Sequence, residues 1–136
     1  MNVTSQWGKT RVMIVNDHPI MRVGLRLAVQ READLELVCE VADEVEAILQ
    51  FGLCHPDVVL VDLQLPHGSG LRAIEAIHRL SPGSPIVVLT TFPGEADVPG
   101  GNALGPVVSV SKAAPSEEIM AAVRKAERAS GHDKPH

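Results

Sequence analysis

Short apolar runs alternate along the chain with longer segments in which apolar residues recur every three or four positions. Strands buried on both faces read as unbroken apolar runs, and amphipathic helices show the longer spacing. The pattern predicts strands over 11–15, 35–41, 58–61, 85–89 and 107–110, and helices over 19–31, 44–51, 71–80 and from 115 onward. Such alternation is typical of a parallel sheet with helices on both faces and right-handed crossovers.

Local signals refine the elements. Asp43 and Glu46 form a capping box before the second helix, and Gly52 is expected to end that helix. The first helix is expected to bury one stripe, made of Ile20, Val23, Gly24, Leu27 and Ala28. Segment 35–41 is expected to be an edge strand with one apolar side, made of Leu35, Leu37, Cys39 and Val41.

Residues 93–106 interrupt the alternation where a fourth crossover helix belongs. The run Pro99-Gly100-Gly101 alone costs a helix about 5 kcal/mol relative to Ala. We therefore predict an irregular or disordered loop, with the fourth helix missing.

Length and composition fit one globular domain. The 136 residues are 45% hydrophobic and 21% charged, and the net charge of -5 argues against nucleic-acid binding by this chain itself. Cys39 and Cys54 lack disulfide or zinc spacing, which favours a reducing compartment. With no secretory or membrane-spanning apolar run, we expect a cytoplasmic protein with a lead-in over 1–10, a domain over 11–129 and a tail or linker start over 130–136.

Four polar residues follow predicted strands: Asp17, Asp62, Thr90 and Lys112. Parallel strands bring their carboxyl ends to one edge of a sheet, so these side chains should converge there. Paired carboxylates with a carbonyl suit Mg²⁺, and a carboxylate can carry an aspartyl-phosphate. An ammonium and a hydroxyl can stabilise the oxygens of a transferring phosphoryl group. For any single Asp at a strand end, a turn or cap is the simpler interpretation.

The sequence resembles a known family at four places. These are RVMIVNDHP at 11–19, PDVVLVDLQLP at 56–66 with Gly68 and Gly70, VLTTF at 88–92, and Lys112. Together they resemble the receiver domain of bacterial two-component response regulators, nearest the NarL/FixJ type, over residues 11–129. The resemblance implies a flavodoxin-like, doubly wound α/β fold with a five-stranded parallel sheet.

The resemblance also implies roles. Asp62 would accept the phosphoryl group, and Asp17, Asp62 and the backbone carbonyl of Gln64 would bind Mg²⁺. Thr90 and Lys112 would contact the phosphoryl group. A sensor histidine kinase would supply it, and a helix-turn-helix domain beyond this chain would bind DNA to regulate transcription. Such a chain is no enzyme with a separate substrate, although it can assist its own phosphorylation and dephosphorylation; a homodimer remains open.

Three departures from the family pattern qualify these expectations. Asn16 stands where a second acid is usual, which should weaken Mg²⁺ binding, and Ser109 replaces an aromatic residue that reports activation. The third departure is the loop over 93–106. They leave open an atypical receiver that is switched by a ligand or partner without phosphorylation. A hydrolase using Asp62 is disfavoured because Gln64, not an acid, follows two residues later. Since the chain lacks a helix-turn-helix, we expect a receiver cut from a longer regulator rather than a single-domain one.

Overall fold

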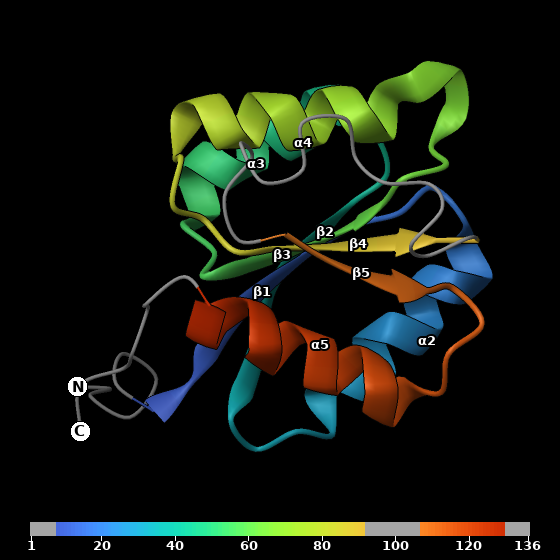
Figure 1. Cartoon of the computed structure of the whole chain (residues 1–136), viewed down its shortest axis with the longest axis vertical. Coiled ribbons are helices and arrows are strands. Elements are labelled where there is room, and N and C mark those ends of the chain that lie inside the picture. Colours follow the sequence, from blue (N-terminus) through green and yellow to red (C-terminus); the bar gives the residue numbers. More distant parts are fainter. Residues whose placement is uncertain (1–7, 92–106, 130–136) are drawn as a thin grey trace.

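A parallel five-stranded sheet forms the centre of the computed structural model, which describes residues 8–91 and 107–129 (Figure 1). The strand order is β2-β1-β3-β4-β5, the order of flavodoxin-like folds. The strands are β1 Thr10–Val15, β2 Leu35–Val41, β3 Val58–Asp62, β4 Ile86–Thr90 and β5 Val107–Ser111. The described α-helices are α2 Pro19–Gln30, α3 Glu44–Cys54, α4 Ser69–Leu80 and α5 Ser116–Ala129. The predicted fold class is confirmed.

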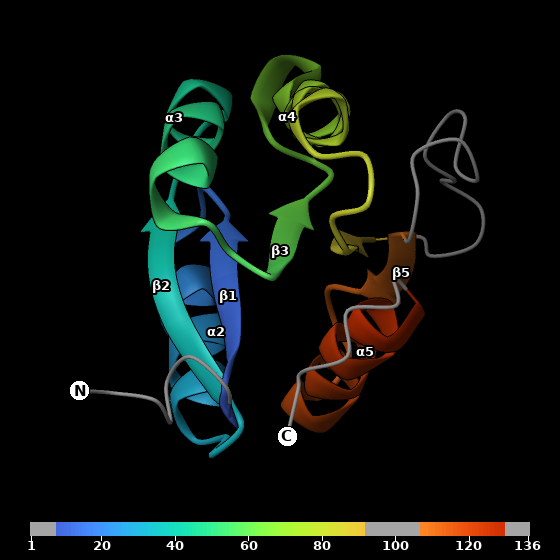
Figure 2. The same ribbon diagram turned by 90° about the vertical axis from the view of Figure 1, so that its left-hand side faces the viewer.

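The helices cover both faces of the sheet. Helices α2 and α5 lie on one face, and α3 and α4 lie on the other (Figures 1 and 2). Successive residues of the central strands point to opposite layers, so Leu60 packs in the α2/α5 core and Val61 in the α3/α4 core. Both side chains are fully buried. Burial on two sides is the reason that these strands read as unbroken apolar runs.

Strand β2 is an edge strand, as predicted, but its apolar residues do not share one side. Leu35 and Leu37 pack in the α2/α5 core, whereas Cys39 and Val41 pack in the α3/α4 core. The pairing with β1 shifts register between Val12, which faces Leu37, and Met13, which faces Cys39. Because the strand carries one extra residue at this bulge, its alternation inverts and the one-sided prediction was wrong.

Helix α2 buries a different stripe from the predicted one. Leu25, Ala28 and Val29 are buried, while Ile20 is 80% exposed and Val23 and Leu27 are also exposed. Met21 packs against the same core and completes a stripe with helical spacing. The sequence of α2 is apolar on more than one side, so periodicity alone could not choose the buried face.

Helices α3 and α4 have boundaries that differ from the predictions. Helix α3 continues through Gly52 to Cys54 and ends at His55, which adopts a left-handed conformation with φ 51°. The predicted cap is present, since the Asp43 side chain accepts the Glu46 N–H at 2.8 Å. Helix α4 begins at Ser69, after a 3-10 turn η1 (Pro66–Gly68) inside the predicted loop. The loop predicted over 93–106 lies outside the described residues.

Candidate functional site

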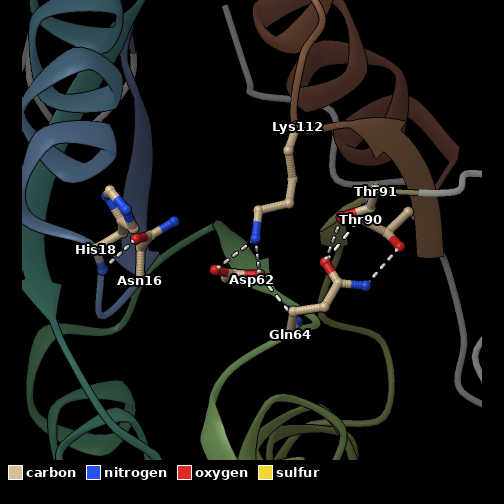
Figure 3. Close-up of polar contacts among 7 residues, drawn as sticks. All are labelled: Asn16, His18, Asp62, Gln64, Thr90, Thr91 and Lys112. Carbon is tan, nitrogen blue, oxygen red and sulfur yellow. Dashed lines mark hydrogen bonds and ion pairs between the residues drawn. The ribbon is translucent and has the colours of Figure 1, made fainter.

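The carboxyl ends of the strands gather the candidate residues at one edge of the sheet (Figure 3). Asp62 is the last residue of β3, and Thr90 is the last residue of the neighbouring strand β4. Asn16 follows β1 on the other side, and Lys112 follows β5. Buried parallel strands thus fix the backbone positions of four polar side chains that are far apart in the sequence.

Asp62 is held by two cationic or polar donors. Its side chain is only 3% exposed, and the Lys112 Nζ lies 3.0 Å from Oδ1 and 3.1 Å from Oδ2. The Gln64 backbone N–H also donates to Oδ1 at 2.9 Å. A buried carboxylate needs such partners to remain charged. The Lys112 side chain is 27% exposed, so the ion pair stands at the boundary between the core and solvent.

Gln64 connects this carboxylate with β4. Its side-chain Nε2 donates to Thr90 Oγ1 at 3.1 Å, and its Oε1 accepts the Thr91 N–H at 3.2 Å. The sequence predicted a role only for the backbone carbonyl of Gln64, and these side-chain contacts were not predicted. No local pattern indicates them, because they join residues 26 and 27 positions apart.

Asn16 is fully buried and helps to build the turn into α2. Its Oδ1 accepts the His18 N–H at 2.7 Å, and its backbone carbonyl accepts a bond from Arg22 Nη1 at 2.8 Å. The Asn16 Nδ2 is buried and has no hydrogen-bond partner among the described residues. In Figure 3 this amide group points toward the side of the site that holds Asp62 and Lys112. A buried donor without a partner is costly, and a ligand oxygen at this edge would satisfy it.

Asp62 ends β3, and Asp17, the other carboxylate expected to bind Mg²⁺, comes shortly after the neighbouring strand β1. Asp17 is exposed and lines a hollow of about 290 Å³ together with Asp43, His67 and Arg72. Within 8–91 and 107–129, no three His, Cys, Asp or Glu side chains cluster as a metal-binding group. Two carboxylates and a backbone carbonyl would leave the other positions around a Mg²⁺ ion to water. The unpaired Asn16 amide could donate to a water in such a shell.

Gly70 brings helix α4 against the backbone of Asp62. A Cβ at Gly70 would lie 2.4 Å from the Asp62 carbonyl oxygen and 2.6 Å from that of Leu63. Both are backbone atoms, which cannot move without displacing the end of β3. The close approach requires glycine at this position.

The two cysteines lie apart from this edge, on β2 and at the end of α3. Both are free and half-buried rather than fully buried. Burial, followed by contact with the Cys54 thiol, raises the pKa of Cys39 to about 12. The Cys39 thiol is therefore protonated at neutral pH and poorly nucleophilic.

None of the helices in the described ranges combines the length and apolar content needed to cross a bilayer.

Comparison with known proteins agrees with the geometry. Residues 12–124 match the family model of the response regulator receiver domain. The chain is 35% identical over 120 residues to the uncharacterized transcriptional regulatory protein YxjL of Bacillus subtilis, covering 88% of this chain and 55% of that protein. It is 34% identical over 115 residues to the oxygen regulatory protein NreC of Staphylococcus aureus, covering 84% of this chain and 53% of that protein.

A solved structure gives the same result. A LuxR-family two-component response regulator from Aurantimonas sp. SI85-9A1 superposes with a TM-score of 0.78 at 29% identity, covering 93% of this chain and 88% of that one. The chain spans about half the length of the curated relatives named above. It therefore belongs to the response regulator receiver domains, in their LuxR-type (NarL/FixJ) group.

Proposed function

We propose that this chain is a receiver that a histidine kinase phosphorylates on Asp62, and that the phosphorylated form controls a DNA-binding output domain. The observation that carries the proposal is the Asp62 carboxylate, 3% exposed at a strand end and paired with Lys112 at 3.0 Å. Such a carboxylate is oriented for attack and lies beside a cation that can neutralise a phosphoryl group.

The reaction is a transfer between two side chains. An Asp62 oxygen attacks the phosphorus of a phosphohistidine, the P–N bond breaks, and the leaving imidazole takes a proton from solvent. The Lys112 ammonium stabilises the negative charge on the phosphoryl oxygens. The Gln64 N–H holds Asp62 Oδ1 at 2.9 Å, so the carboxylate keeps its orientation while Oδ2, which Lys112 Nζ contacts at 3.1 Å, attacks. The Thr90 hydroxyl would donate a hydrogen bond to a phosphoryl oxygen.

Magnesium would complete the site. Asp17, Asp62 and the Gln64 carbonyl would hold it, and when bound it supplies further positive charge beside the phosphoryl oxygens. Asn16 brings an amide where an acid would add a negative charge. We therefore expect Mg²⁺ to bind more weakly to the wild type than to Asn16→Asp.

The kinase would dock beside this edge. Ile20 is 80% exposed at the start of α2, and Val23 and Leu27 continue the apolar surface along the helix. Exposed apolar side chains next to a functional edge suit a protein partner. Contact there would bring the phosphohistidine within reach of Asp62 in the cytoplasm.

The output would lie outside this chain. The net charge of -5 disfavours direct DNA contact, and YxjL, of which the match covers 55%, is named a transcriptional regulatory protein. We propose that a helix-turn-helix domain following the receiver binds DNA, with a receiver homodimer as one route by which phosphorylation would promote that binding.

Intact-mass measurement tests the proposal. Incubation with Mg²⁺ and a small phosphodonor should add one phosphoryl group to the wild type and none to Asp62→Ala. Circular dichroism of Asp62→Ala controls for folding. A folded wild type that gains no phosphoryl mass while another receiver is labelled would contradict the proposal and favour the atypical, phosphorylation-independent receiver.

A further inference from the structure

Gln64 forms hydrogen bonds both with Asp62 at the end of β3 and with the residues at the end of β4. Its backbone N–H donates to Asp62 Oδ1 at 2.9 Å, and its side-chain Nε2 donates to Thr90 Oγ1 at 3.1 Å. Its Oε1 accepts the Thr91 N–H at 3.2 Å and lies 3.4 Å from the Thr91 hydroxyl. One side chain therefore contacts the hydroxyl of Thr90 and the backbone of the residue that follows it.

The contacts of Gln64 determine which way the Thr90 hydroxyl points. Thr90 is fully buried, whereas Gln64 and Thr91 are exposed, so the carboxamide lies over Thr90 on its solvent side. In Figure 3 the Thr90 hydroxyl that binds Gln64 lies on the far side of the carboxamide from the Asp62–Lys112 ion pair. To reach a phosphoryl group on Asp62, this hydroxyl must turn and break its bond with Gln64 Nε2.

A threonine side chain makes such a change in one step. Its χ1 angle occupies a few staggered positions, so the hydroxyl points either toward Gln64 or elsewhere, without stable intermediates. The bond from the Thr91 N–H to the same carboxamide adds a second constraint, because moving Gln64 also frees the backbone after β4. The two positions of Thr90 would then be coupled to two states of this backbone.

We propose that Gln64 is a positioning residue that holds the Thr90 hydroxyl away from Asp62 in the unphosphorylated chain. Phosphorylation of Asp62 attracts the hydroxyl, releases the Gln64 carboxamide and thereby frees the backbone at Thr91. The proposal rests on the proposed function and adds to it the means by which the acceptor site is connected with β4. It also assigns a readout to a chain that has Ser109 on β5 and no Tyr.

Binding of beryllofluoride, a phosphoryl mimic, measures the opposing effect of Gln64. Titrations in saturating Mg²⁺ would compare the wild type with Gln64→Met, which keeps the chain length and the backbone carbonyl but loses both hydrogen-bonding atoms. One net hydrogen bond corresponds to about a two- to tenfold change in affinity. We expect Gln64→Met to bind beryllofluoride tighter by that factor.

Thr90→Val separates positioning from a general change in structure. In the Thr90→Val background, the Gln64→Met substitution should leave the affinity unchanged, because there is no hydroxyl to hold. Tighter binding by Gln64→Met in both backgrounds, or no gain in either, overturns the proposal. Asp62→Asn should abolish binding in every background.

Amide exchange at Thr91 tests the contact without any phosphoryl mimic. The Thr91 N–H should be protected in the wild type and should exchange at least fivefold faster in Gln64→Met, while the Val88 amide inside β4 is unaffected. Unchanged exchange at Thr91 overturns the proposal even if beryllofluoride binds. A different result would be a wild type that fails to bind beryllofluoride although Thr91 exchange responds as expected. The contact between Gln64 and Thr91 would then exist, but the proposed phosphorylation of Asp62 would be wrong. The positioning role of Gln64 depends on that phosphorylation and would be wrong as well.

Discussion

The ion pair between Asp62 and Lys112 shows how the core and the site depend on each other. Asp62 ends a strand whose other residues are fully buried, so its carboxylate lies at a position that water scarcely reaches. The Lys112 ammonium, 3.0 Å away, compensates for that lost hydration. Under the proposed function, the same ammonium would also stabilise a phosphoryl group on Asp62.

Lys112→Met should destabilise the fold because it leaves the Asp62 carboxylate without its cation. We expect a loss of about 1–3 kcal/mol in the free energy of unfolding, measured with urea at pH 7. Adding Asp62→Asn to Lys112→Met should restore part of it, since the unpaired charge is then removed. A double variant as unstable as the sum of the two single variants would contradict this explanation.

Gly70→Ala should be harmful for a steric reason. Its Cβ would lie 2.4 Å from the Asp62 carbonyl oxygen, so α4 or the end of β3 must shift. We expect thermal unfolding to show a loss of about 1–3 kcal/mol, together with weaker phosphoryl labelling of Asp62.

Gly52→Ala is the matched control. Gly52 lies inside α3, and a Cβ there meets no atom within 4 Å. Alanine should therefore stabilise the chain by about 0.5–1 kcal/mol through helix propensity. Similar effects of the two substitutions would show that the close approach at Gly70 is not what matters.

At the scale of elements, α5 is fastened to the turn between α2 and β2. Arg124 Nη2 lies 2.6 Å from Glu32 Oε1 and 2.7 Å from Asp34 Oδ1, and its Nε donates to Asp34 Oδ2 at 2.9 Å. The bidentate geometry holds two segments together that are far apart in the sequence. All three side chains are partly exposed, so solvent and salt weaken the interaction.

Arg124→Gln should cost about 0.5–1 kcal/mol of stability at pH 7. The hydrogen bond from Arg124 lowers the pKa of Asp34 in the folded state below that of the unfolded chain. This contribution is therefore fully present above about pH 4 and is lost as the pH falls through the lowered pKa. Urea unfolding of both proteins between pH 2.5 and pH 7 should show the difference shrinking at low pH. Lys125→Gln, an equal charge change at an exposed position of α5, should show no comparable difference.

At the scale of the whole molecule, exposed large apolar side chains lie on α2, on α3 and at the end of α4. Ile20 lies at the start of α2, beside the carboxyl edge of the sheet, and Leu80 lies at the end of α4, by the opposite edge. They are 80% and 58% exposed. Of these two side chains, Ile20 lies at the edge that holds Asp62, and it is the one that we propose as a kinase contact.

Ile20→Ser should slow phosphotransfer from a histidine kinase that labels the wild type by at least tenfold, because burying an isoleucine in an interface is worth about 1.5–3 kcal/mol. Labelling by a small phosphodonor should fall far less. Leu80→Ser should affect neither rate, and gel assays of phosphotransfer would measure both. Equal losses for Ile20→Ser with both donors would indicate damage to the site instead of lost docking.

The sequence by itself determined the order and type of the elements, the layered α/β fold and the family. Apolar runs too short for helices, bounded by Pro, Gly and Asp, leave few alternatives to buried parallel strands, and strand ends place Asp62, Thr90 and Lys112 at one edge. Only the tertiary structure decided which apolar face of α2 is buried, how the bulge inverts β2, and that Gln64 contacts Asp62 through its backbone N–H and Thr90 through its side chain. A local sequence pattern determines whether a segment has helical or strand periodicity. Which face of a helix is buried, which side of a strand each residue points to and which side chains pair depend on contacts between segments distant in the chain.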